Sequence, residues 1–336
     1  MKIAAYEVRP DEKPVLEAQC EKYGIELIFC TAANLDKSTV DNAEGADAIT
    51  TLGQSDYCDE VLDKLSGFGV KILGSRCVGW NHMNVAYAKK LGFKICHGSY
   101  PPNGVAEYTI MAMLLCNRRF KKSLYNTNDN DFTLKGKMGR EIVRQTVGVV
   151  GCGNIGATVV KILSGFGCRI LAYDVFERDD VKQYAKYVDL DTIYKECDII
   201  TLHMPLLPST TGFINDEAIA NMKDGVTLIN NARGELVDID AVIKGIETGK
   251  IGQLFMDAFP GETGIIHVPH DEDIIHTPGM PYFKLKYLRS FINVYHTPHM
   301  AFFTAEAGEA MVVSGIEGVY ECFKNGRSTH EIPEMK

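Results

Sequence analysis

The sequence predicts an α/β protein built on two doubly wound parallel sheets, and three observations support this fold class. Short apolar runs alternate with helix-like segments in residues 1–100 and again in residues 145–260. This alternation is typical of a parallel sheet with helices on both faces. The runs are continuously apolar, as expected of strands buried on both faces. At 336 residues the chain is also long enough for two domains.

Composition and charge exclude several classes of protein. The chain is 46% hydrophobic and carries a formal net charge of −9, without the basic patch of a nucleic-acid binder. No apolar run has the length of a membrane span, and residues 1–10 resemble a first strand rather than a signal peptide. The 10 cysteines form no C-x-x-C pair and no zinc-type cluster. We therefore expect a cytoplasmic protein with reduced thiols and no metal.

The first alternation predicts a domain without a nucleotide-binding motif. No glycine-rich phosphate loop follows any of its strands. Strands are expected at Lys2–Glu7, Glu26–Phe29, Ala48–Leu52 and Val70–Gly74. Helices are expected at Lys13–Tyr23, Asp59–Leu65 and Val85–Leu91.

A stiff break, Tyr100-Pro101-Pro102-Asn103, precedes a very apolar helix at Val105–Arg118. Asn103 or Gly104 is a plausible N-cap for this helix. A helix that is apolar nearly all round is either central or part of an oligomer contact. We expect it to be the first crossing between the two domains.

The second alternation is longer and fits a dinucleotide-binding domain, whose ligand loops lie at the carboxyl ends of the strands. Strands are expected at Thr146–Val150, Arg169–Tyr173, Ile199–His203, Val226–Asn230 and Gln253–Met256. The helices between them include Ile155–Leu163, Asp216–Met222 and Ile239–Thr248.

The first strand of this domain leads into V-G-V-V-G-C-G-N-I-G, residues 147–156. Gly151 permits the turn, Gly153 lets the backbone approach a pyrophosphate, and Gly156 lets helix and strand pack closely. The next strand ends in Asp174, 23 residues after Gly151, where an acid holds the ribose hydroxyls. An acid there repels a 2′-phosphate, which favours NAD over NADP.

The rest of the chain suggests a return to the first domain. A strand at Ile292–Tyr295 is followed by a closing helix at Thr304–Phe323. We expect a discontinuous substrate domain, 1–101 and 300–336, around an NAD-binding domain, 102–299, with the ligand in the cleft between them. The irregular segment 261–281 contains three histidines whose spacing fits no metal motif: His267, His270 and His276.

Arg233, Glu262 and His299 each follow a strand end and have side chains suited to a 2-keto acid substrate. A guanidinium can bind the substrate carboxylate in a bidentate manner. Histidine can supply a proton to the developing alkoxide, and a neighbouring carboxylate would orient the imidazole and raise its pKa. Taken singly, the histidine also fits a hydrogen-bonded core residue and the arginine a surface ion pair.

Four motifs resemble the D-isomer-specific 2-hydroxyacid dehydrogenase family over essentially the whole chain. They are Gly151–Gly156, Asn230–Asp238, Met256-Asp257 with Glu262, and Thr297-Pro298-His299. Three further stretches resemble its D-lactate dehydrogenase branch: Arg76–His82, Tyr100–Glu107 and Thr297–Thr304.

The resemblance implies a Rossmann NAD-binding domain inserted into a flavodoxin-like substrate domain. It implies that Arg233 binds the substrate and that His299 is the acid/base, paired with Glu262. The implied substrate-binding residues are Val78 and Gly79, through their N–H groups, with Tyr100, Leu52 and Phe302. The implied cofactor-binding residues are Gly151, Gly153, Asn154, Ile155, Gly156, Asp174, Met204, Pro205, Thr210, Asn231, Ala232, Arg233 and Asp257. Family members are usually homodimers through the nucleotide domain.

The implied function is NAD-dependent, reversible reduction of a 2-keto acid to the (R)-2-hydroxy acid, with pyruvate and D-lactate as the first expectation. Leu52 stands where some lactate-specific members have an aromatic residue, and the large Trp80 lies beside the carboxylate loop. One methylene in such a pocket shifts preference by only roughly 1–3 kcal/mol. The alternative substrates are therefore bulkier 2-keto acids: 2-ketoisocaproate, phenylpyruvate and 2-oxoglutarate. A non-catalytic, NAD-sensing protein of the same fold is the other alternative.

Overall fold

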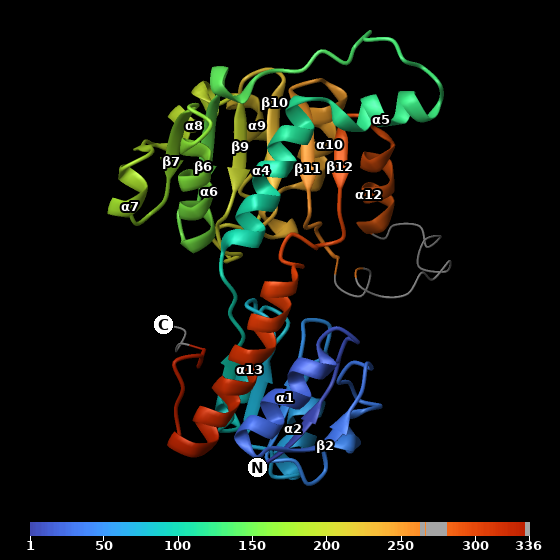
Figure 1. The fold of residues 1–336 in the computed structure, drawn as a ribbon, viewed down its shortest axis with the longest axis vertical. Helices are drawn as coiled ribbons and strands as arrows, with labels where there is room; N and C mark the ends of the chain where they lie inside the picture. Colours follow the sequence, from blue (N-terminus) through green and yellow to red (C-terminus); the bar gives the residue numbers. More distant parts are fainter. Residues whose placement is uncertain (263–265, 267–280, 333–336) are drawn as a thin grey trace. The chain divides into compact units, whose positions relative to one another are not determined.

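The computed structural model describes residues 1–262, 266 and 281–332, and the chain forms two compact units (Figure 1). The N-terminal unit comprises Met1–Pro101 and Phe303–Lys336, and the central unit comprises Pro102–Phe302. Each unit has one sheet, and the named strands pair in parallel throughout the described residues. The predicted fold class is confirmed.

The N-terminal unit has a five-stranded sheet in the order β2-β1-β3-β4-β5, the flavodoxin-like arrangement. Its strands are β1 (Lys2–Ala5), β2 (Glu26–Cys30), β3 (Ala48–Thr51), β4 (Ile72–Ser75) and β5 (Lys94–His97). Its helices are α1 (Lys13–Tyr23), the 3-10 helix η1 (Val40–Ala43), α2 (Asp59–Gly67), α3 (Val85–Lys90) and α13 (Ala305–Asn325).

Helices cover both faces of this sheet. Successive strand residues point to opposite faces, so neighbouring residues of one strand pack into different apolar clusters. Ile3 packs into a cluster with residues of α1 and α13. Ala4 packs into a second cluster with residues of α2 and α3. Helix α13 approaches β4 closely at Gly74, where a Cβ atom would lie 2.5 Å from Val319 Cγ2.

The central unit has a seven-stranded sheet in the order β12-β11-β10-β9-β6-β7-β8. The direction of winding reverses between β6 and β9, which is where such folds bind ligands. The strands are β6 (Thr146–Val150), β7 (Arg169–Tyr173), β8 (Lys186–Tyr187), β9 (Ile199–Leu202), β10 (Val226–Asn230), β11 (Ile251–Met256) and β12 (Val294–His296).

Helices and short 3-10 turns flank this sheet and build two apolar clusters. Val147 and Val149 of β6 pack with α4 and α6, whereas Val150 packs with α8, α9 and α10. The helices are α4 (Asn103–Asn117), α5 (Phe120–Asn128), η2 (Ile142–Arg144), α6 (Asn154–Ser164), α7 (Asp179–Lys182), α8 (Leu190–Glu196), α9 (Asp216–Asn221), η3 (Gly234–Leu236), α10 (Ile239–Glu247) and α12 (Pro281–Ser290). None of the helices in the described ranges is both long and apolar enough to cross a lipid bilayer.

Several element boundaries differ from those predicted. Strand β1 ends at Ala5, because Glu7 has a left-handed backbone with φ of +53°. The N-cap of α4 is Pro102, so the predicted cap at Asn103 or Gly104 is wrong. Strand β12 begins at Val294, two residues later than expected. The elements β5, β8, α5, α7, α8 and α12 were not among those predicted. His267, His270 and His276 lie outside the described residues.

Candidate active site

The glycine-rich turn between β6 and α6 has the geometry of a pyrophosphate site. Gly151 has φ of +91°, which only glycine adopts readily. A Cβ atom on Gly156 would lie 1.9 Å from Gly151 O, so turn and helix are in direct backbone contact. A Cβ atom on Gly153 would meet no atom within 4 Å, which leaves this side open to a ligand. Anions bind the free N–H groups at such a helix start.

Asp174 follows β7 and bonds to this turn. Its carboxylate accepts hydrogen bonds from the N–H groups of Cys152 (2.5 Å) and Phe176 (3.0 Å). Arg178 Nη1 donates to Asn154 Oδ1 at 3.1 Å, a contact that no sequence motif signals. Burial raises the pKa of the Cys152 thiol to about 11, which keeps this thiol protonated at neutral pH.

The loop after β9 contains the next predicted cofactor residues. Thr210 Oγ1 donates to Pro205 O (2.7 Å) and accepts from the Leu207 N–H (2.8 Å), so its side chain closes the loop. Met204 is buried at the start of the loop. The side chain of Thr210 therefore has a structural role besides its predicted contact with the cofactor.

Asn231, in the loop after β10, provides an independent sign of a ligand. The side chain is buried, and its Nδ2 donates to Thr109 Oγ1 at 3.2 Å. Its Oδ1 is buried and has no hydrogen-bond partner in the described part of the chain. Such an atom needs a partner, and a donor on the cofactor would satisfy it. The open glycine turn and this acceptor both fit NAD.

Arg233 lies on a loop that packs tightly against the loop after β11. A Cβ atom on Gly234 would lie 2.1 Å from the backbone carbon of Phe259, so the two backbones touch. The Gly261 N–H also donates to Glu235 Oε1 at 3.1 Å. The Arg233 guanidinium itself donates from Nη1 to Ala232 O at 2.8 Å. These contacts bring the arginine-bearing loop next to residues 259–261, which immediately precede Glu262.

His299 and Glu262 form a direct pair. His299 Nδ1 hydrogen-bonds to Glu262 Oε1, and Glu262 Oε2 accepts from the Phe259 N–H at 2.9 Å. The carboxylate is therefore fixed on one side by the backbone and on the other by the imidazole. Because Nδ1 is occupied, Nε2 is the nitrogen left for proton exchange with a substrate.

Asp257 holds the loop that carries His299. Its side chain is 1% exposed. Its Oδ1 accepts from Thr297 Oγ1 (2.5 Å) and the Met300 N–H (3.0 Å), and Oδ2 accepts from the Ala301 N–H (2.8 Å). The Asp257 carbonyl accepts from the His299 N–H at 2.8 Å. This positioning role was missed, because the sequence shows an acid at a strand end but not what it bonds to.

A second histidine, His296, ends β12. Burial and the charge of Arg289 lower its pKa to about 4, so this imidazole is neutral at neutral pH. Its ring packs edge-on against Phe259, with centroids 6.4 Å apart. Of these two histidines, His299 is therefore the one with the carboxylate partner that suits an acid/base.

The other predicted substrate residues divide between the units. Phe302, in the central unit, has its ring edge-on to His299 with centroids 6.4 Å apart. The remaining four lie after β3, β4 and β5 of the N-terminal unit: Leu52, Val78, Gly79 and Tyr100. Within the described ranges, no group of three or more His, Cys, Asp or Glu side chains could hold a metal ion.

Known proteins resemble this chain over most of its length. The family model for the NAD-binding domain of D-isomer specific 2-hydroxyacid dehydrogenases matches residues 110–301. An aromatic 2-oxoacid reductase of Clostridium sporogenes is 39% identical over 316 residues, 93% of each chain. A D-lactate dehydrogenase of Lactobacillus delbrueckii subsp. bulgaricus is 37% identical over 322 residues, 95% of each chain.

Solved structures that resemble this fold come from the same family. The NAD-complexed crystal structure of a D-isomer specific 2-hydroxyacid dehydrogenase from Lactobacillus delbrueckii ssp. bulgaricus superposes with a TM-score of 0.86 at 34% identity. The match covers 99% of this chain and 100% of that structure.

Proposed function

Because this chain belongs to the D-isomer-specific 2-hydroxyacid dehydrogenase family, whose members are NAD-dependent enzymes, we propose that it reversibly reduces a 2-keto acid to the (R)-2-hydroxy acid. The observation that carries the proposal is the His299–Glu262 pair, held by Asp257 and Phe259. Such a pair delivers a proton to an oxygen that gains negative charge. Bound NADH supplies the hydride.

Each residue then has a defined task. The Arg233 guanidinium binds the substrate carboxylate, because a planar fork matches its two oxygens. His299 Nε2 donates its proton to the carbonyl oxygen as this oxygen becomes an alkoxide, and Glu262 stabilises the imidazolium form in the reverse direction. The N–H groups of Val78 and Gly79 are predicted to bind the same carboxylate.

Pyruvate is the first proposed substrate, and phenylpyruvate is the second. A relative at 37% identity is named a D-lactate dehydrogenase, whereas one at 39% is named an aromatic 2-oxoacid reductase. Leucine at position 52 is also smaller than the aromatic residue that some lactate-specific members have there, and a smaller residue leaves more room for the side chain of the substrate. Both observations support phenylpyruvate as the alternative substrate to pyruvate.

The test is NADH consumption with pyruvate, phenylpyruvate, 2-ketoisocaproate and 2-oxoglutarate, followed by chiral analysis of each product. We expect (R)-2-hydroxy acids. A preference of tenfold or more for one acid, which corresponds to about 1.4 kcal/mol, decides the substrate. Tight NADH binding without turnover of any acid would contradict the proposal and favour the NAD-sensing alternative.

We also propose that the protein is a cytoplasmic homodimer formed through the central unit. None of the 10 cysteines, all of which lie in the described residues, forms a disulfide bond, in keeping with a reducing compartment. Large apolar side chains are exposed along α4, α5 and the segment that follows them, and such exposure marks an interface. They are Met111, Leu114, Phe120, Leu124, Tyr125, Phe132, Leu134, Met138 and Val143. Sedimentation should give a dimer for the wild type and a monomer for the Leu124→Glu/Phe132→Glu variant.

A further inference from the structure

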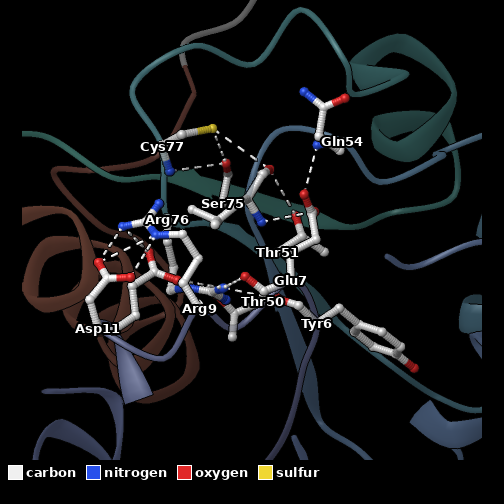
Figure 2. A network of polar contacts seen from close by, with 12 residues as sticks. Tyr6, Glu7, Arg9, Asp11, Thr50, Thr51, Gln54, Ser75, Arg76 and Cys77 are labelled. Carbon is white, nitrogen blue, oxygen red and sulfur yellow. Dashed lines mark hydrogen bonds and ion pairs between the residues drawn. The ribbon is translucent and has the colours of Figure 1, made fainter. Parts of the chain in front are cut away.

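A buried ionic network lies at the carboxyl ends of β1, β3 and β4 in the N-terminal unit (Figure 2). Its first member, Glu7, is 7% exposed and has φ of +53°. A left-handed backbone is uncommon for residues other than glycine, and a buried carboxylate is costly unless it is well bonded. Both costs fall on one residue.

The Glu7 carboxylate accepts hydrogen bonds from the loop that follows β3. Oε2 accepts from the Leu52 N–H (3.0 Å) and from Ser55 Oγ (2.5 Å), and Oε1 accepts from the Gln54 N–H (2.8 Å). Three donors of the loop that follows β3 thus converge on a single side chain. This loop contains Leu52, the residue predicted to contact the substrate side chain.

Arg76 fixes the backbone of Glu7. Its guanidinium is fully buried. Nη2 donates to the carbonyls of Tyr6 (2.9 Å) and Glu7 (3.1 Å), and also to Glu12 Oε2 (3.4 Å). These bonds hold the end of β1 in the left-handed conformation, which aims the Glu7 side chain at the neighbouring loop.

Cys77 links this loop to the next one. Its Sγ lies 2.9 Å from Ser75 Oγ (Figure 2). It also lies 3.0 Å from Gly79 O and 3.7 Å from Leu52 O. Gly79 is one of the two predicted carboxylate-binding residues. The network therefore joins the two loops that carry Leu52 and Gly79.

We propose that Glu7 is a positioning residue that sets the enzyme's selectivity for the side chain of the 2-keto acid. It fixes the backbone on both sides of Leu52, and so determines the space left beside the substrate. Strained residues persist where the surrounding structure fixes their conformation, and they cluster at functional sites. A loop that is already ordered binds with a smaller entropic cost. The inference rests on the proposed function.

The main test compares Glu7→Gln with Glu7→Gly. Glutamine keeps the length of the side chain but replaces one acceptor oxygen by an amide NH2, which leaves a loop donor unpaired. Glycine suits the left-handed backbone but removes all acceptors. We expect both variants to lose about tenfold or more in kcat/KM for pyruvate, mainly through KM, because small displacements of positioning groups are costly. We also expect an altered ratio of phenylpyruvate to pyruvate.

Glu12→Gln is the matched control. Glu12 is buried in the same network and bonds Arg76, but its hydrogen bonds within the described residues go to Arg9 and Arg76 and not to the 52–55 loop. We expect this variant to lower the melting temperature and to leave the ratio of the two acids unchanged. NADH affinity, measured by fluorescence titration, should stay within about twofold in all three variants, since the glycine-rich turn lies in the central unit.

Trp80 gives a readout that does not depend on turnover. It is the only tryptophan in the chain and directly follows Gly79. Acrylamide should quench its fluorescence more strongly in Glu7→Gln and Glu7→Gly than in Glu12→Gln, because the joined loops loosen. If the wild type reduces no 2-keto acid, the proposed function fails, and the quenching still decides whether Glu7 holds the loops.

The proposal is overturned if Glu7→Gln and Glu7→Gly lower only the melting temperature, with KM, substrate ratio and Trp80 quenching as in Glu12→Gln. Ser55→Ala covers the case in which neither Glu7 variant folds. It removes one of the three donors to the Glu7 carboxylate, and it should shift the substrate ratio in the same direction by a smaller factor. An unchanged ratio in Ser55→Ala would then count against the proposal.

Discussion

His299 has a left-handed backbone, with φ of +51°, and Asp257 bonds to the loop around it through both its side chain and its carbonyl. Asp257 binds three donors of the loop at residues 297–301 and accepts the His299 N–H through its carbonyl. The imidazole is then held by Glu262 through Nδ1. At the scale of single residues, the proposed proton donor is held through its backbone as well as through its side chain.

Changing His299 to Gln should lower kcat by about 10²–10⁴-fold, which is the range supplied by a positioned general acid. The fold and NADH affinity should be retained, as checked by circular dichroism and fluorescence titration. His296→Gln is the control: this imidazole is neutral at neutral pH and interacts with the Glu262 charge only through space, and its Nε2 has no hydrogen-bond partner within the described residues. Near-normal turnover in His299→Gln would contradict the acid/base role.

Changing Asp174 to Ala should erode the preference for NADH over NADPH. The carboxylate sits on the Cys152 N–H of the glycine-rich turn, where it would repel a 2′-phosphate. Steady-state kinetics with both cofactors measures the change as the ratio of their kcat/KM values. An unaltered ratio would mean that another residue, such as the nearby Arg178, sets the selectivity.

The acid/base candidates could be predicted because each has a distinctive side chain directly after an apolar strand. His299 and Glu262 could therefore be put forward as a pair without a structure, and their hydrogen bond agrees with that pairing. Glu7 was not, since its role depends on a positive φ and on three donors contributed by residues 45–48 positions away. Neither property leaves a local pattern in the sequence.

At the scale of elements, local signals explain which parts of the fold could be predicted. The strand–turn–helix of β6 and α6 was predictable because glycines at fixed spacing follow an apolar run. Strand β5 reads K-I-C-H, with too few apolar positions to stand out. Helix α12 follows a stretch without periodicity, and its own apolar face is weak. These two elements depend on tertiary packing more than on their own sequences.

Gly156→Ala should disrupt the contact between turn and helix. The new Cβ would lie 1.9 Å from Gly151 O, so α6 must move away from the turn. We expect NADH affinity to fall by at least about tenfold, because a shift of 1 Å in a positioning element is costly. Gly153→Ala is the control for stability alone, since a Cβ there meets no protein atom within 4 Å but lies on the side open to a ligand. Stability should therefore fall in Gly156→Ala and stay nearly unchanged in Gly153→Ala.

At the scale of the whole molecule, two histidines make the stability of the central unit depend on pH. Burial lowers the pKa of both His203 and His296 to about 4, from 6.5. Between these values the unfolded chain binds more protons than the folded one, so the free energy of unfolding decreases as the pH falls from about 6.5 towards 4.

We expect each histidine to cost about 1–2 kcal/mol of stability at pH 5 relative to pH 7.5. Urea unfolding followed by circular dichroism at the two pH values measures this difference. His296→Gln should unfold with a smaller pH dependence, because it no longer titrates. An equally steep dependence in that variant would show that the protonation of other groups controls acid stability.

Helix α13 belongs to the N-terminal unit, although the whole central unit precedes it in the chain. Its residues Val312, Ile316 and Val319 complete an apolar cluster with Ile3 and Ile72, and it presses on Gly74 of β4. During translation at roughly 5–20 residues per second, about 200 residues separate the two parts, a delay of roughly 10–40 seconds. One apolar face of the first sheet therefore stays exposed on the ribosome until α13 has been synthesised. We expect chaperones to bind the nascent chain at this stage.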